Sequence, residues 1–245
     1  LKENFSEVET FVRIIKTATQ VRVGTELFNE TLTIADRGIF DVFDFKVTHG
    51  NRQNLFDQQR NIVISEWAAK KYFGDTDPLG KILSLQLAEN FEDFTVSGVT
   101  KLPANSSIQF YLLISDLNLP VLYSEQTLTS QWFNITPETY VLLRDGVNPQ
   151  TVIDKFPSVF KTILGEEDFK KSKYAPGLQP LTTIHLDTSF PAGIAPVSNP
   201  EYTYILSAIA LLILVIGCIN FVTLSIGRSL KRAKEVGIRK VVGAL

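Results

Sequence analysis

The charged side chains near the C-terminal end are the ones whose types and spacing point to a defined interaction. Residues 226–245 hold six basic residues and one acidic residue, Glu235. At the 3.6-residue period of a helix the charges gather on one face. That face carries Arg228, Lys231, Arg232, Glu235 and Arg239, and Lys240 follows directly. Side chains of this kind form ion pairs with anionic lipid headgroups or with acidic groups of a protein partner.

Gly237 lies on the opposite, apolar face of this predicted helix. A glycine in a helix interior costs about 1 kcal/mol relative to alanine, so it needs a reason such as close packing against a partner. Glu235 precedes Arg239 by four residues, a spacing that supports a helix by roughly 0.2–0.5 kcal/mol. Two interpretations stay open from the residues alone: the segment contacts a protein, or it is a basic flank that lies on the membrane.

The rest of the chain holds no pattern of residues that supports enzymatic chemistry. Gly80-Lys81 lacks the upstream glycine and the following hydroxyl residue of a phosphate-binding loop. His49 and His185 each stand alone, and neither Ser65 nor Ser97 lies in the Gly-x-Ser-x-Gly frame of a nucleophile. We therefore predict no catalytic residue, no metal and no cofactor, and we expect the chain not to be an enzyme.

A charge-free run of 23 residues, Tyr202–Leu224, must position the basic segment. As a helix it would span roughly 34 Å, which exceeds a hydrocarbon core of about 30 Å. Short flanks rich in Lys and Arg stay on the cytoplasmic side of a membrane. The sequence therefore predicts a membrane-spanning helix, with the basic segment inside the cell and the preceding residues outside. A buried helix of a soluble core is disfavoured, since such helices tend to be shorter and lack a one-sided basic flank.

Composition limits what the part before the basic segment can bind. Residues 1–224 hold 18 basic and 25 acidic residues, a net charge of −7, so no nucleic-acid surface is expected. The one cysteine, Cys218, falls inside the span, so the outer part has no disulfide framework. The chain contains no Met, and we expect it to be a piece of a longer polypeptide.

The outer part is predicted to be an α+β domain built from two strand–helix units. In the first, strand 61–64 leads into a helix that begins at the N-cap Ser65 and ends at Gly74. In the second, strand 139–144 leads to a helix capped by Asn148. Further predicted elements are β-leaning runs at 11–15 and 20–23, strands at 31–35, 45–48, 81–87, 94–100 and 178–183, and a short helix or turn at 37–43.

Three irregular features complete the predicted layout. Residues 101–138, which hold Trp132 and Phe133, are expected to form a small inserted subdomain. Pro157 is expected to kink or break the helical stripe that ends at Gly165. The proline-containing stretch 189–200 is expected to be a stiff connector. We therefore expect an extracytoplasmic domain over 1–200, a transmembrane helix over 201–225 and a cytoplasmic amphipathic segment over 226–245.

Several segments, in the same order, resemble MacB/FtsX-type ABC transporter permeases. Residues 232–244 (RAKEVGIRKVVGA) are similar to the cytoplasmic signature that follows the second span of these permeases. Residues 61–83 and 94–107 resemble the extracytoplasmic MacB-like core domain, and 138–152 and 178–186 its later part. The resemblance implies a porter-like sheet-and-helix subdomain with a small inserted subdomain. It also implies four spans per permease, with the outer domain between the first two.

The resemblance also implies a function and partners. Such permeases act as mechanotransmitters, which use ATP hydrolysed by a fused or separate cytoplasmic ATPase to do work outside the membrane, in export or extraction of a substrate. The residues implied to contact the ATPase are Arg228, Arg232, Glu235, Gly237, Arg239 and Lys240. The expected setting is the cell (inner) membrane and its lipid, with a homodimer or pseudo-dimer of permeases and a periplasmic partner. The alternative is the outer sensor domain of a single-span receptor.

Overall fold

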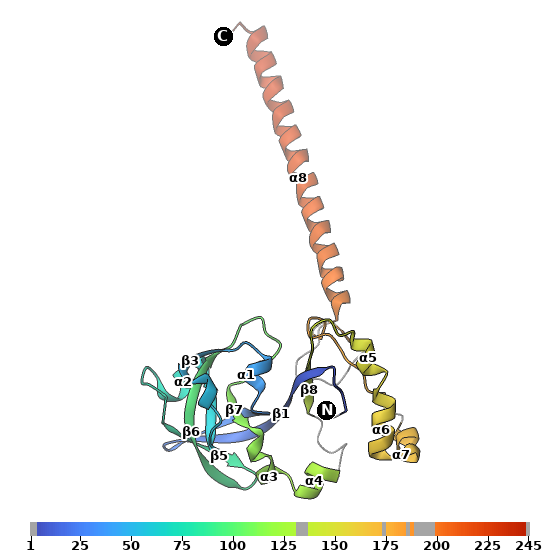
Figure 1. Ribbon diagram of the computed structural model, residues 1–245. Coiled ribbons are helices and arrows are strands. Elements are labelled where there is room, and N and C mark those ends of the chain that lie inside the picture. The colour runs from blue at the N-terminus through green and yellow to red at the C-terminus, as the bar shows by residue number, and fades with distance from the viewer. Residues whose placement is uncertain (1–3, 131–136, 173–174, 185–186, 189–198, 244–245) are drawn as a thin grey trace. The chain divides into compact units, whose positions relative to one another are not determined.

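The computed structural model describes residues 4–130, 137–172, 175–184, 187–188 and 199–243 (Figure 1). The chain divides into two compact units, one that holds the mixed sheet and its helices and one that holds the long C-terminal helix. Each is described by itself. In chain order the elements are β1 (Val8–Val23), β2 (Glu26–Ala35), α1 (Ile39–Val42), β3 (Lys46–Gly50), β4 (Asn61–Ser65), α2 (Glu66–Phe73), β5 (Ile82–Leu87), β6 (Asn90–Lys101), β7 (Leu112–Ser115), α3 (Leu119–Leu122), α4 (Glu125–Ser130), β8 (Glu138–Leu143), α5 (Pro149–Ile153), α6 (Phe156–Leu164), α7 (Glu166–Ser172) and α8 (Pro200–Val241), with short 3₁₀ turns at Arg52–Asn54 and Asp116–Asn118.

The eight strands form one sheet in the order β2-β7-β4-β6-β5-β1-β8, and β3 pairs with β6. β1 also pairs with β2 over a long antiparallel hairpin, from Ile14 opposite Ala35 to Val23 opposite Glu26. The path β1-β2-β7-β4-β6-β5 therefore returns to β1 and closes six strands into a ring. The closing contact between β1 and β5 is short, with only Val21 and Arg22 in register with β5.

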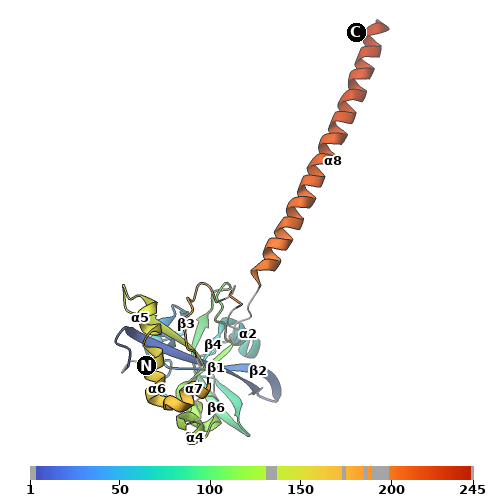
Figure 2. The ribbon, with the colours of Figure 1, turned by 90° about the vertical axis from the view of Figure 1, so that its right-hand side faces the viewer.

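The two faces of this sheet carry separate apolar cores because side chains alternate along each strand. One core gathers residues such as Val21, Leu32, Ile64, Leu85 and Ile114, together with Ala68 of α2. The other gathers Val12, Ile14, Val63 and Leu113 with the aromatic residues around α1. A third, smaller core joins the chain start to α5 and α6, which lie near the N-terminal end of the described chain in both views (Figures 1 and 2).

Local capping signals in the sequence predicted several helix ends correctly. Ser65 Oγ accepts a hydrogen bond from the Ala68 N–H at 3.1 Å, and Gly74 ends α2 with φ +62°. Asn148 Oδ1 accepts from the Gln150 N–H at 3.0 Å and starts α5. The predicted break at Pro157 is confirmed, since α5 ends at Ile153 and α6 begins at Phe156. The mixed α+β class is confirmed as well.

The β-leaning runs 11–15 and 20–23 are confirmed as strand, and both belong to one 16-residue strand, β1. Two other expectations were wrong. Residues 112–115, inside the predicted inserted subdomain, are the buried strand β7 of the main sheet, parallel to β2 and antiparallel to β4. Residues 178–183 contain no strand, and Pro180 explains this because it has no N–H for a ladder. Trp132, Phe133, His185 and residues 189–198 of the predicted connector lie outside the described residues.

Candidate functional site

The predicted coupling residues all lie on α8, a helix of 42 residues. At 1.5 Å per residue its length is about 63 Å. It begins at Asn199, whose side-chain oxygen accepts from the Glu201 N–H at 2.9 Å, with Pro200 at the first position. Arg239 and Lys240 occupy its last turn, where cations interact favourably with the helix dipole. The helix runs without interruption from the charge-free run into the basic segment.

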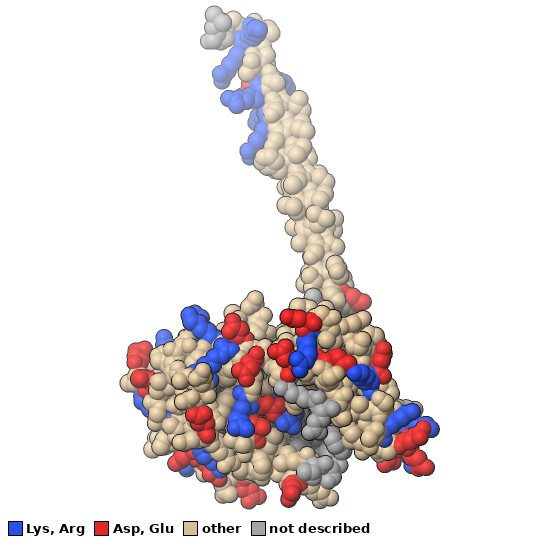
Figure 3. Space-filling model, in the orientation of Figure 1, with Lys and Arg blue, Asp and Glu red and all other residues tan. Residues whose placement is uncertain are grey.

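The composition of α8 changes along its length while its exposure does not. None of its residues is buried, and the helix is long and apolar enough to cross a membrane. Figure 3 shows the blue Lys and Arg side chains gathered toward its C-terminal end, beyond a long stretch without charges. The structure has no break at residues 225–226, so the expected transmembrane and amphipathic parts are continuous in one helix.

The structure brings the six predicted coupling residues onto four consecutive turns of this helix. Arg228, Arg232, Glu235 and Arg239 share one face by their helical spacing, whereas Lys240 lies off that face. No ion pair joins Glu235 to Arg239 in the described part of the chain. A Cβ added at Gly237 would meet no heavy atom within 4 Å, so nothing described in this chain requires a glycine there.

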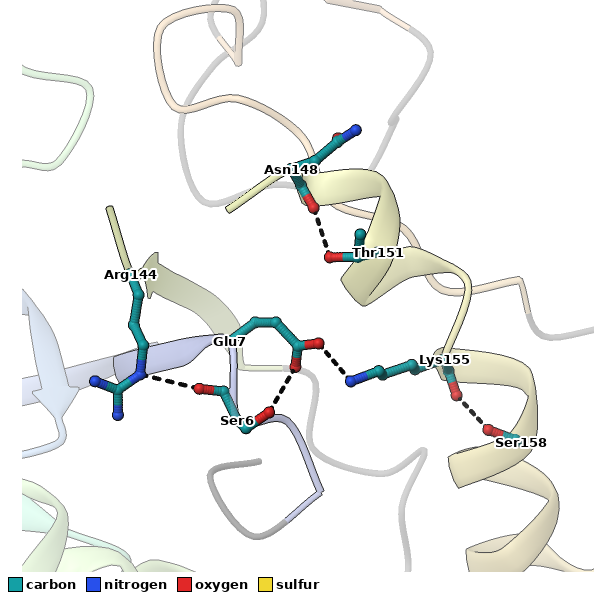
Figure 4. Close-up of polar contacts among 7 residues, drawn as sticks. All are labelled: Ser6, Glu7, Arg144, Asn148, Thr151, Lys155 and Ser158. Carbon is teal, nitrogen blue, oxygen red and sulfur yellow. Dashed lines mark hydrogen bonds and ion pairs between the residues drawn. The ribbon is translucent and has the colours of Figure 1, made fainter. Parts of the chain in front are cut away.

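A second set of contacts holds the start of the outer domain in place. We call this set of residues the N-terminal junction. It comprises Phe5, Ser6, Glu7, Val8, Arg144, Val152, Lys155 and Phe156. Glu7 forms an ion pair with Lys155, and Arg144 Nε donates to the Ser6 carbonyl at 2.9 Å (Figure 4). The Phe5 and Phe156 rings meet edge-on, with centroids 5.2 Å apart. The junction thus ties the first described residues to α5 and α6.

The charges of the N-terminal junction favour the ionised form of the Glu7 carboxylate. The hydrogen bond from Lys155, helped by the residue's own backbone N–H, lowers the pKa of Glu7 below its ordinary value of 4.5. The sequence predicted the apolar stripe of Val152 and Phe156 but not its partners, because about 150 residues separate Phe5 from Phe156. The only local signal was the apolar pair Phe5 and Val8 just before β1.

An open groove lies where β1 and β5 diverge. It has a volume of about 690 Å³ and is lined by polar residues of β1 and β2, the end of β5, and Tyr111. Thr19 Oγ1 donates to the Gln86 carbonyl at 2.9 Å across the gap. The Tyr111 ring also contacts the exposed Trp67 ring, tilted by 35° with the centroids 4.6 Å apart. Among the described residues, no group of three or more His, Cys, Asp or Glu side chains gathers to hold a metal, and the groove presents no nucleophile with a base.

The comparison with known families decides what the first unit is. A family model described as the MacB-like periplasmic core domain matches residues 1–159. The chain belongs to this family. The resemblance to MacB/FtsX-type permeases is therefore confirmed, and the MacB-like domain is a permease-type domain followed by one candidate transmembrane helix.

Individual relatives agree with this assignment. The macrolide export ATP-binding/permease protein MacB of Neisseria meningitidis is 26% identical over 231 residues, which cover 88% of this chain and 31% of that protein. MacB of Campylobacter fetus is 27% identical over 197 residues, which cover 79% of this chain and 26% of that protein. The chain thus spans about a third or less of the length of these relatives.

A solved structure has the same fold as the first unit. A crystallised domain of a protein described as a permease from Porphyromonas gingivalis superposes with a TM-score of 0.55 and 26% sequence identity. The match covers 66% of this chain and 73% of that chain. The family, the relatives and this fold together support the role of an ABC transporter permease with an extracytoplasmic part.

Proposed function

We propose that this MacB-like chain is part of an ABC transporter permease that transmits ATP-driven motion to its extracytoplasmic domain. The observation that carries the proposal is the continuity of α8, which passes from a charge-free span into a basic segment without a break. In this arrangement residues 1–200 lie outside the cell membrane, 201–225 cross it and 226–245 begin the cytoplasmic FtsX-like part. The motion serves export or extraction of a substrate.

The helix geometry supports a role as a lever. Within α8 the only proline is Pro200, at the first position, where it disturbs no hydrogen bond of the helix. An uninterrupted helix moves as one rod, so a displacement at its cytoplasmic end reaches its outer end. Kinks need a proline, an insertion or a similar defect, and the described helix has none in its interior.

ATP hydrolysis belongs, in this proposal, to a cytoplasmic ATPase domain or subunit rather than to the chain itself. The contact residues are Arg228, Arg232, Glu235, Gly237, Arg239 and Lys240. The open space around Gly237 supports close approach of a partner backbone. The basic side chains that surround this contact would also meet anionic lipid at the inner surface of the membrane. A homodimeric or pseudo-dimeric permease and a periplasmic partner complete the assembly.

The test uses the full-length protein with and without residues 228–245. We expect an ATPase to co-purify only when these residues are present. Glu235→Arg and Gly237→Leu should weaken capture of the ATPase by at least about tenfold while membrane insertion persists, because each places a repulsive charge or a bulky side chain in the contact. Glu89→Arg, which makes the same charge reversal at an exposed position far from the tail in the sequence, is the matched control and should bind normally.

Two results would contradict the proposal. Capture of the ATPase by the truncated protein would remove the coupling role from the tail. Absence of any ATPase from the full-length preparation would favour the alternative, an outer sensor domain whose helix leads to a signalling module.

A further inference from the structure

The open groove where β1 and β5 diverge carries polar side chains on a face of the sheet that is otherwise apolar. Thr17 and Thr19 lie on the same face of β1 as the core residue Val21, because side chains alternate along a strand. Glu30 of β2 lies directly opposite Thr19. Side chains on a core face are normally apolar, so polar groups there indicate a site with another purpose. The Thr17 hydroxyl has no hydrogen-bond partner among the residues that the structure describes.

The one charged side chain that lines the groove is already neutralised within the chain. That residue is Glu30, and its carboxylate forms an ion pair with Lys71 of α2. The Glu30 side chain is only 7% exposed. A charged ligand would have to separate this pair, which would leave a buried charge without its counter-charge. The groove therefore favours a neutral ligand.

Two exposed aromatic rings lie beside this ion pair. Tyr111, which lines the groove, is 45% exposed, and Trp67, which contacts Tyr111, is 53% exposed. The Lys71 ammonium lies 4.9 Å from the centroid of the Trp67 ring. The two rings and the Glu30 carboxylate thus belong to one connected set of contacts. An exposed ring of this kind offers a flat apolar surface to a ligand.

The backbone at the end of β5 is strained where it lines the groove. Ala88 has a φ of +54° and is the one non-glycine residue with a positive φ in the described part of the chain. A glycine would adopt this conformation without the steric cost that a Cβ brings. Strain of this kind is concentrated at functional and ligand-binding sites. The alanine thus places a methyl group in the wall of the groove in spite of that cost.

We propose that this groove binds a neutral oligosaccharide. Sugar hydroxyls both donate and accept hydrogen bonds, and they match side chains that do the same. The lining supplies such hydroxyl and carboxamide side chains from Thr17, Gln20, Asn29, Thr31 and Gln86. The Tyr111 ring packs against the C–H face of a sugar ring. The groove volume of about 690 Å³ falls within the range of about 300–1,000 Å³ that is usual for ligand sites.

Two other classes of ligand match the groove less well. An apolar molecule would cover hydroxyl and carboxamide groups without giving them hydrogen bonds, which is unfavourable. An extended peptide that adds a strand to a sheet needs free backbone groups at the sheet edge. In this gap the Gln86 carbonyl already accepts a hydrogen bond from Thr19 at 2.9 Å. A saccharide, which is recognised by side chains, needs no free edge.

The test is isothermal titration calorimetry of the full-length protein in a detergent without a sugar headgroup. The probes are chitotetraose and maltotetraose, which are neutral oligosaccharides, and a neutral peptide of serine, threonine and valine. We expect at least one oligosaccharide to bind with a Kd below about 1 mM, and we expect the peptide not to bind.

Variants of the lining locate the bound saccharide. Tyr111→Ala should weaken binding by at least about tenfold, and Thr17→Val by roughly threefold to tenfold. Thr10→Val, the same change on β1 outside the groove lining, is the matched control. Ala88→Gly should weaken binding by roughly threefold through the lost methyl contact. The same variant should be at least as resistant to urea as the unaltered protein, because it relieves the backbone strain. Loss of folding cannot produce that combination.

Three results would overturn the proposal. One is that neither oligosaccharide binds. Another is that the peptide binds as tightly as either oligosaccharide, which would make the groove a peptide site. The third is that Tyr111→Ala, Thr17→Val and Ala88→Gly all bind like the unaltered protein, which would place the saccharide elsewhere. The groove lies within the first unit, whereas ATPase capture depends on residues of α8, so failure here is distinguishable from failure of the proposed function.

Discussion

The ion pair between Glu7 and Lys155 makes the N-terminal junction sensitive to acid. The pKa of Glu7 is lower in the folded protein than its ordinary value of 4.5 because Lys155 stabilises the carboxylate. The stabilisation is therefore fully present above about pH 4.5 and disappears as the pH falls through the lowered folded pKa. Glu7→Gln should lower the free energy of unfolding near neutral pH. In acid, where Glu7 is protonated, the variant and the unaltered protein should be equally stable.

Urea unfolding followed at a series of pH values measures this effect. Glu9→Gln is the matched control, because Glu9 is exposed and has no ion pair in the described part of the chain. A pH-independent difference between Glu7→Gln and the unaltered protein would show that the junction does not depend on this charge.

The backbone at position 50 requires a glycine. Its φ is +93°, and an added Cβ would lie 2.4 Å from the Ser97 carbonyl oxygen, a backbone atom of β6. Gly50→Ala should therefore lower the free energy of unfolding by about 1–3 kcal/mol or more. Gly177→Ala, at a site with open space and no positive φ, should stay within about 0.5 kcal/mol of the unaltered protein. Equal stability of the two variants in thermal melts would show that the β3–β6 pairing relaxes around the new methyl group.

Residue-scale prediction from the sequence succeeded where the cause is local. Ser65, Gly74, Asn148 and Gly165 act on backbone groups within a few positions of themselves, so their types alone indicate helix ends. The role of Glu7 could not be predicted, because its partner is 148 residues away and only the fold brings them together.

At the scale of elements, β7 shows why a buried strand is hard to recognise. All four of its residues are buried, and both of its faces are covered, so its sequence shows no alternation of polar and apolar residues. Its pairing strands, β2 and β4, lie far away in the chain. The sequence therefore suggested an inserted subdomain where the structure has the strand that joins β2 to β4 within the ring.

The central place of β7 predicts a large cost for shortening its side chains. Ile114 is fully buried between neighbours from several strands. Ile114→Ala should lower the free energy of unfolding by about 2–5 kcal/mol, through lost burial and the cavity that remains. Leu117→Ala, three residues later at a side chain that is 37% exposed, should cost less than half as much. Similar unfolding midpoints for the two variants would contradict the assignment of β7 to the core.

At the scale of the whole molecule, the amino-acid pattern of α8 was the strongest signal in the sequence. A charge-free run and a one-sided basic flank are properties of consecutive residues, so they need no tertiary context to be recognised. The closed ring of six strands needed that context. Its closure depends on a contact of two residues between β1 and β5, and neither strand's sequence specifies the other. The long apolar helix was therefore predictable, whereas the topology of the sheet was not.

The lever role of α8 predicts that a break between span and tail will uncouple the two ends. Ser229→Pro removes one backbone hydrogen bond and clashes with the carbonyl of Ser225, at a cost of about 3 kcal/mol, and kinks the helix. In the full-length permease we expect the ATPase to bind and the protein to insert as before. The change in hydrogen exchange that ATP causes in the outer domain should disappear, whereas Ser229→Ala should preserve it. An outer domain that still responds fully to ATP through the kinked helix would mean that the motion travels by another route.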